Sequence, residues 1–154
     1  MFDDRISEGL KKLDLFKDLT LDQLEIVSEQ VKMLIVEPET VIFNQGDAGN
    51  AVYFIVEGNL DVILRSDWGE DVTLANLGPG TSFGEMSIID GLPRSAGVVA
   101  KAKASIIRLG KDRFEHILRY HPDIGVIILR WLARFMSDHL RRTNETLSDF
   151  LEQR

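Results

Sequence analysis

The amino-acid sequence predicts a mainly β fold, an eight-stranded antiparallel β-roll of the jelly-roll (double-stranded β-helix) type, with N-terminal helices and a long C-terminal helix. Three observations support this class. Residues 33–110 form short runs rich in β-branched and aromatic residues, turn residues separate these runs, and helical periodicity is confined to the two ends of the chain. Since no separator is long enough for a crossover helix, an antiparallel roll is favoured over a parallel α/β sheet.

Composition indicates one ordinary soluble domain. The chain has 154 residues, of which 44% are hydrophobic and 28% charged, enough for a single core. Cysteine is absent, the N-terminus has no basic and apolar leader, and no apolar run approaches about 18 residues, so we expect a cytoplasmic protein without a membrane partner. The net charge of −7 disfavours general binding to nucleic acids, which relies on many Lys and Arg side chains.

The first part of the chain, residues 1–32, is predicted to be a helical lead-in. Residues 7–30 place apolar side chains at helix-compatible spacings, which favours one or two amphipathic helices. Thr20, followed by Asp22 and Gln23, indicates the start of a second helix.

The second part, residues 33–110, is predicted to form the roll. Its separators are rich in Gly, Pro, Asn and Asp, which turn a chain at low steric cost. The predicted strands are residues 33–37, 40–43, 51–57, 59–65, 71–76, 81–83, 97–100 and 105–109.

The strand pattern is interrupted within residues 83–97, and we expect the residues that carry the chemistry of the site to lie there. Residues 85–89 are long enough for a single helical turn, whose free N–H groups near Gly84 and Glu85 suit an anion. The guanidinium of Arg94 fits two phosphate oxygens, and Ser95 and the Ala96 backbone add donors. The Glu85 carboxylate suits a ribose hydroxyl. The alternative is a simple ion pair between Glu85 and Arg94 beneath a loop.

The third part, residues 111–154, is predicted to be helical. A first helix covers residues 113–120, a break follows at His121 and Pro122, and a long helix covers residues 123–150. At 1.5 Å per residue this helix extends roughly 42 Å, more than one small roll covers. Its stripe consists of Leu129, Leu132, Met136, Leu140, Thr143, Leu147 and Phe150. We therefore expect a homodimer through this helix, the alternative being that the stripe packs only on its own roll.

Catalytic and metal sites are not expected. Jelly rolls that bind metals draw histidines from their strands, whereas His116, His121 and His139 all lie in the C-terminal helices and are interpreted as solvent-facing or capping. Nucleotide-hydrolysing, serine-hydrolase and zinc-protease motifs are absent from the sequence. The chain is therefore predicted to be neither an enzyme nor a metalloprotein, and to need no cofactor.

The residues around the interruption resemble the cyclic-nucleotide-binding domains, most narrowly the sensor domain of the bacterial cyclic AMP receptor (catabolite activator) proteins. Residues 83–98 look like the phosphate-binding cassette of that family, residues 44–47 look like its glycine–aspartate motif, and residues 53–58 look like its hairpin motif. The match covers about residues 15–151. The resemblance implies a cyclic nucleotide ligand, with contacts from Phe83, Gly84, Glu85, Met86, Ser87, Arg94, Ser95 and Ala96.

The resemblance extends to the base. Residues 139–147 look like the long dimer helix of the receptor proteins, in which a threonine and the polar residue after it approach adenine from two subunits. Thr143 and Asn144 occupy those places, which favours cyclic AMP while leaving cyclic GMP possible. Val62 and Leu74 are expected to form apolar walls around the purine. The turn at residues 38–40 departs from the family, which often has a glycine there.

These features predict an allosteric sensor that acts by a ligand-induced conformational change. The receptor proteins continue into a helix-turn-helix module, whereas this sequence stops at Arg154, so we expect no direct binding to nucleic acid. The alternatives are the sensor part of a transcription regulator whose DNA-binding domain is absent here, and a scaffold that kept the fold but lost its ligand. The residues do not identify the downstream protein partner.

Overall fold

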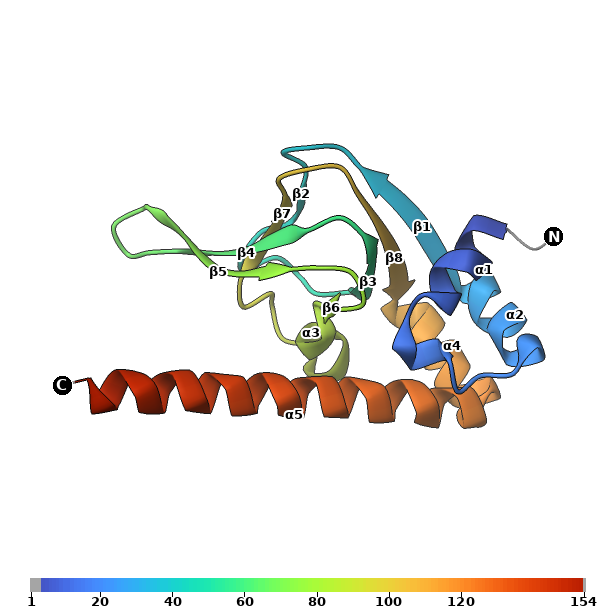
Figure 1. The fold of residues 1–154 in the computed structure, drawn as a ribbon. Coiled ribbons are helices and arrows are strands. Elements are labelled where there is room, and N and C mark those ends of the chain that lie inside the picture. Colours follow the sequence, from blue (N-terminus) through green and yellow to red (C-terminus); the bar gives the residue numbers. More distant parts are fainter. Residues whose placement is uncertain (1–3, 154) are drawn as a thin grey trace.

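The computed structural model describes residues 4–153 and folds them as a β-roll with helices at one end and one long helix beneath it (Figure 1). The roll has two four-stranded antiparallel sheets, with strand orders β1-β8-β3-β6 and β2-β7-β4-β5. The strands are β1 (Val31–Val36), β2 (Val41–Phe43), β3 (Ala51–Glu57), β4 (Leu60–Arg65), β5 (Asp71–Leu77), β6 (Ser82–Phe83), β7 (Gly97–Ala100) and β8 (Ala104–Gly110). The predicted eight-stranded antiparallel roll is therefore confirmed.

Strand bounds agree with the predicted ranges to within a few residues. Strands β3 and β7 coincide with them, while β1 begins at Val31 because it pairs with β8 along its whole length, from Val31 opposite Leu109. Helices hold 45% of the described residues, so the fold is less predominantly β than the sequence predicts.

The N-terminal helices are α1 (Asp4–Lys11), the short 3-10 helix η1 (Asp14–Phe16) and α2 (Leu21–Gln30). The predicted second start is confirmed, because Thr20 is the N-cap of α2 and forms a capping box with Gln23. The Gln23 N–H donates to Thr20 Oγ1 at 3.2 Å, and the Thr20 N–H donates to Gln23 Oε1 at 2.9 Å. Each side chain thus satisfies a backbone donor that the helix leaves unpaired.

Two apolar cores hold the molecule together. One lies inside the roll, where Tyr53 and Phe83 stack with ring centroids 4.9 Å apart. The other joins the β1-β8-β3-β6 sheet to the helices at the end of the roll. In the second core Phe54 contacts Phe16 of η1 on one side and Trp131 on the other, with ring centroids 5.8 and 5.9 Å apart. Because successive side chains of a strand point to opposite faces, one sheet contributes residues to both cores.

The C-terminal helices are α4 (Lys111–Tyr120) and α5 (Pro122–Glu152). Helix α5 has 31 residues and so extends about 46 Å, running beneath the helical end and then beneath the roll (Figure 1). Its N-terminal half is anchored by buried Ile124, Ile128 and Leu132, whereas large apolar side chains of its C-terminal half are exposed. Among residues 4–153 no helix is both long and apolar enough to span a bilayer.

Candidate functional site

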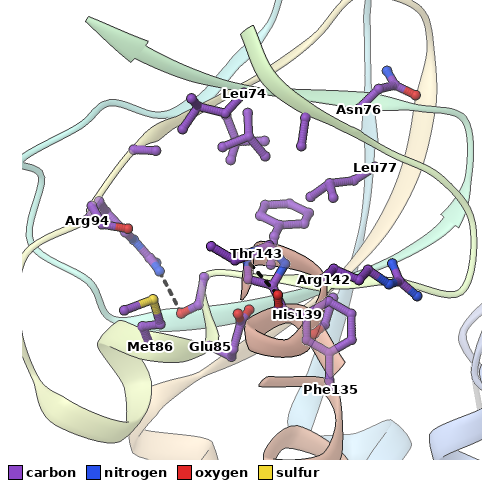
Figure 2. A pocket seen from close by; sticks show the side chains of 18 of the residues that line it. Leu74, Asn76, Leu77, Glu85, Met86, Arg94, Phe135, His139, Arg142 and Thr143 are labelled. Atoms are coloured by element: carbon purple, nitrogen blue, oxygen red, sulfur yellow. Dashed lines mark hydrogen bonds between the residues drawn. The ribbon is translucent and has the colours of Figure 1, made fainter. Parts of the chain in front are cut away.

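A cavity of about 860 Å³ lies between the roll, the cassette helix α3 (Glu85–Asp90) and α5 (Figure 2). Most residues predicted for the site line it, although they come from distant parts of the chain. These residues are Val62, Leu74, Phe83, Gly84, Glu85, Met86, Ser87, Arg94, Ser95, Ala96 and Thr143. The volume falls in the range of about 300–1,000 Å³ that is usual for small-molecule sites.

Gly84 sets the start of α3. Its φ of 79° lies in the left-handed region, which side-chain-bearing residues rarely adopt. A Cβ at this position would lie 2.5 Å from Nη1 of Arg94 and 3.2 Å from the carbonyl oxygen of Ala51. Only glycine therefore lets the cassette turn and lets Arg94 approach the backbone.

Arg94 is held from several sides and is only 5% exposed. Its Nη1 donates to the Gly84 carbonyl and its Nη2 to the Ala51 carbonyl, both at 2.9 Å. The guanidinium carbon lies 4.1 Å from the ring centroid of Phe43, a cation–π geometry. Burial lowers the pKa of Arg94 from its ordinary value, but arginine keeps its charge in proteins. The arrangement fixes a positive charge at the cavity wall.

The loop before β3 fixes the main chain of Arg94. The Arg94 N–H donates to the Asp47 carbonyl, and the Gly46 N–H donates to the Arg94 carbonyl, both at 2.8 Å. These bonds tie the glycine–aspartate motif to the cassette.

Glu85 brings an unsatisfied, charged acceptor to the cavity. Its Oε2 atom is buried and has no hydrogen-bond partner within residues 4–153. Burial raises the pKa of the Glu85 carboxyl, while its own backbone N–H, His139 and Arg94 act in the opposite direction. No ion pair joins Glu85 to Arg94 in this described range, so the simple-pair alternative is not what the structure contains. An acceptor in this state is ready for a ligand donor.

The roll supplies an apolar wall opposite the cassette. Val62 of β4 and Leu74 of β5 line the cavity, together with Leu77 and with Asn76 of the same strand. Leu74 is 55% exposed although it is apolar. Exposed apolar side chains beside a charged cassette suit a ligand with a flat, weakly polar part.

Thr143 lines the cavity from α5 and donates its hydroxyl to the His139 carbonyl at 3.0 Å. Its oxygen is then available as an acceptor. Asn144 does not line this cavity, because successive helix residues point about 100° apart. Its predicted approach to the base is therefore not made within its own chain.

Sequence reasoning missed most of the α5 residues at the site. The cavity also contains Phe135, His139, Arg142, Thr146, Leu147 and Phe150. The sequence predicts that His139 is solvent-facing or capping; it is exposed, and it also lies at the cavity. Leu147 and Phe150 belong to the stripe predicted for a partner helix, but they lie at the cavity of their own chain. Helical spacing counted from Thr143 was the signal that could have found them.

Among residues 4–153 no group of three or more His, Asp or Glu side chains is arranged to hold a metal ion. The ring pair His116 and His121 lies at the corner between α4 and α5, with centroids 6.1 Å apart. Neither residue lines the cavity.

Comparison with known proteins agrees with this geometry. A family model described as Cyclic nucleotide-binding domain matches residues 34–121. The CRP-like cAMP-activated global transcriptional regulator of Mycobacterium tuberculosis is 26% identical over 146 residues, which cover 95% of this chain and 63% of the regulator. The cAMP-dependent protein kinase regulatory subunit of Yarrowia lipolytica is 34% identical over 109 residues, covering 71% of this chain and 28% of the subunit. This chain thus matches only part of the length of these relatives.

Solved structures share the fold. A cyclic nucleotide-binding domain from Methylobacillus flagellatus superposes with a TM-score of 0.82 at 26% identity, covering 95% of this chain and 82% of that one. The catabolite activator protein of Thermus thermophilus superposes with a TM-score of 0.75 at 30% identity, covering 90% and 62%.

Proposed function

This chain belongs to the cyclic nucleotide-binding domain family, and we propose that its cavity binds cyclic AMP in preference to cyclic GMP. The observation that carries the proposal is the pair of Glu85 and Arg94. A buried acceptor without a partner and a buried, fixed cation face the same cavity without pairing with each other. A sugar phosphate supplies what each lacks, a hydroxyl donor and an anion.

The phosphate end of the proposed ligand lies at Arg94. The guanidinium has five N–H donors, and the two bonds to carbonyls leave others for phosphate oxygens. The cassette adds the backbone of Gly84, Met86 and Ala96 and the hydroxyl of Ser95, in a place that Arg94 makes positive. A singly charged cyclic phosphate fits a site with one fixed cation.

The ribose end lies at Glu85. Its carboxylate accepts the 2′-hydroxyl, which satisfies the orphaned Oε2 atom. A hydrogen bond to a charged group contributes about 1.5–3 kcal/mol. This contact discriminates ribose from deoxyribose.

The base lies between the apolar wall and α5. Adenine presents its N6 amino donor where guanine presents the O6 acceptor, and the Thr143 oxygen is available as an acceptor because its proton is engaged by the His139 carbonyl. This polarity favours adenine. Asn144 approaches the same base from the second chain of a homodimer, since it is turned away from the cavity of its own chain.

The proposed activity is non-catalytic signalling, in a cytoplasmic protein. The cavity is shared by the roll, α3 and α5, so an occupied cavity favours one packing of α5 over another. The helix carries that change to a partner, which in this proposal is another protein and not nucleic acid.

The proposal is tested by replacing Arg94 and titrating cyclic AMP by calorimetry. Arg94→Ala is expected to weaken binding by about 2–4 kcal/mol, because a charged hydrogen-bond partner of the phosphate is removed. Arg94→Lys should bind cyclic AMP with an affinity between those of the wild type and Arg94→Ala, because lysine keeps the charge but lacks the planar fork of the guanidinium. Arg65→Ala, at an exposed arginine of β4 outside the cavity, is the matched control and should bind as the wild type. Unchanged affinity in folded Arg94→Ala would refute the proposed phosphate site.

A further inference from the structure

We propose that Phe43 is a positioning residue for phosphate recognition, whose ring holds the guanidinium of Arg94 in place before a ligand binds. This inference rests on the proposed function and adds to it a residue outside the cassette. Phe43 is the last residue of β2, far from Arg94 in the sequence, and it lines the same cavity.

The charge of Arg94 is buried without an acidic partner. The residue is only 5% exposed, and no ion pair within residues 4–153 involves it. Its Nη1 and Nη2 atoms donate to the carbonyls of Gly84 and Ala51, and the ring centroid of Phe43 lies 4.1 Å from its Cζ. The attraction between a cation and an aromatic face is stronger where water is excluded. The ring therefore stabilises the face of the guanidinium, while the carbonyls bind its edge.

The ring of Phe43 is itself held by the core of the roll. Its centroid lies 6.0 Å from that of Tyr53 and 6.0 Å from that of Phe83. These two rings are buried, and they stack on each other with centroids 4.9 Å apart. Close-packed side chains keep to one arrangement, so the core fixes the ring that Phe43 offers to Arg94.

The residues that follow Phe43 hold the main chain of Arg94. The Gly46 N–H donates to the Arg94 carbonyl, and the Arg94 N–H donates to the Asp47 carbonyl, both at 2.8 Å. The Asn44 N–H donates to Asp47 Oδ2 at 2.9 Å, which closes the turn. One short segment therefore contacts both the backbone and the guanidinium of Arg94.

A guanidinium held in this way meets an anion without first being ordered. Arg94 points toward the start of α3 at the wall of the cavity (Figure 2), and its two bonds to carbonyls leave other donors for a ligand. Without the ring of Phe43, one face of the guanidinium is open to water, and its orientation must be fixed when the ligand binds. Because ordering a long side chain opposes binding, we expect loss of the ring to weaken the binding of cyclic AMP about two- to tenfold.

The first measurement needs no ligand. NMR relaxation of the Arg94 Nε–H reports how rigid the guanidinium is in the free protein. The wild type should give an order parameter near that of rigid backbone, about 0.85, and Phe43→Leu, which stays apolar but has no ring, should give one below about 0.6. A trifluorinated phenylalanine in place of Phe43 keeps the shape of the ring but withdraws electron density from its face, so its order parameter should lie between those two values. Equal rigidity of Arg94 in all three proteins overturns the inference, whatever the cavity binds.

The second measurement shows whether Phe43 acts through Arg94. Cyclic AMP is titrated by calorimetry into the wild type, Phe43→Leu, Arg94→Ala and the double variant, which gives the coupling between the two side chains. Phe43→Leu should weaken binding about two- to tenfold when Arg94 is present and should have no effect in the Arg94→Ala background. Phe135→Leu, at an aromatic residue that lines the cavity from α5, is the matched control, and its effect should be the same in both backgrounds.

An equal loss of affinity from Phe43→Leu in both backgrounds would mean that the ring acts without Arg94, and it overturns the inference. Unchanged affinity of Phe43→Leu when Arg94 is present also overturns it, and both results leave the proposed function intact. If the wild type binds no cyclic AMP, the proposed function fails, whereas the order parameters still show whether Phe43 holds Arg94.

Discussion

The two charged residues of the cassette differ in their surroundings: Arg94 is buried, whereas Glu85 is partly buried with its Oε2 atom out of reach of solvent. Arg94 has two carbonyl acceptors and an aromatic face, so its burial is compensated. Glu85 has an acceptor atom without a partner, so its burial is not. Arg94 is therefore satisfied within the chain, whereas the Glu85 acceptor is costly to bury until the proposed ligand supplies a donor.

Replacing Glu85 should separate binding from stability. Because burial raises the folded-state pKa of Glu85, its contribution to stability is fully present below the unfolded pKa and is lost as the pH rises through the folded pKa. Glu85→Gln, which is always neutral, should thus be as stable as the wild type or more stable at pH 7, with the difference vanishing towards about pH 4. Thermal unfolding at several pH values measures this.

The same variant should lose affinity for cyclic AMP by about 1.5–3 kcal/mol. The control is Glu29→Gln, at an exposed position of α2, which should change neither property. A Glu85→Gln variant that is less stable than the wild type at pH 7 and binds normally would show that Glu85 is a structural residue.

At the level of residues, the sequence alone suggests a site where the candidate groups are close together along the chain. Gly84, Glu85, Arg94 and Ser95 lie close together along the chain, and their types alone suggest an anion and a sugar. His139 and Asn76 were missed because their place at the cavity depends on how α5 and β5 dock onto the cassette. That docking depends on tertiary packing, which helical or strand periodicity does not specify.

At the scale of elements, turn residues and capping signals located most boundaries. Thr20 begins α2 as its capping box indicates, and the glycine-rich separators end the strands. The order of strands in each sheet could not be read in this way, since β1 pairs with β8 and β2 with β7 across long stretches of chain. Long-range pairing depends on packing of the whole roll.

Helix α5 has one face at the cavity and a second, exposed apolar face. Thr143, Leu147 and Phe150 lie at the cavity of their own chain, which corrects part of the stripe assigned to a partner. Leu140 does not line the cavity and is 60% exposed, and Leu151 is 54% exposed. These side chains form an exposed apolar face, which in the proposed homodimer packs on a second copy of α5.

The proposed homodimer is tested by placing a charge on that face. Light scattering should give the wild type twice its chain mass of 17.4 kDa at micromolar concentration, and Leu140→Glu should shift the mass to that of one chain, because a buried unpaired charge is costly at an interface. Leu21→Glu on α2, at a leucine that is 73% exposed, is the control and should remain dimeric. A monomeric wild type, with or without nucleotide, rules out this assembly.

At the scale of the molecule, a row of aromatic rings connects the cavity to the N-terminal helices. Phe135 at the cavity stacks on Trp131 with centroids 5.4 Å apart, Trp131 contacts Phe54, and Phe54 contacts Phe16. A ligand that moves Phe135 therefore acts on side chains that are already in contact, up to the helical end of the roll.

Tryptophan fluorescence can follow this coupling. Trp131 is partly buried beside Phe135, whereas Trp68 is 92% exposed in the β4–β5 hairpin. Cyclic AMP should change the emission of the wild type and of Trp68→Phe by about the same amount, and Trp131→Phe should lose most of the change. Loss of the change in Trp68→Phe instead would place the response in the hairpin.

The central claim is that one cavity per chain holds a cyclic nucleotide through Glu85 and Arg94, and calorimetric titration of the wild type with cyclic AMP and cyclic GMP tests it most directly. We expect one nucleotide per chain with a dissociation constant of about 1 μM or lower for cyclic AMP, and binding of cyclic GMP weaker by about 1–3 kcal/mol because Thr143 offers an acceptor to the base. The absence of binding heat with both nucleotides, across temperatures that change the binding enthalpy, would contradict the account.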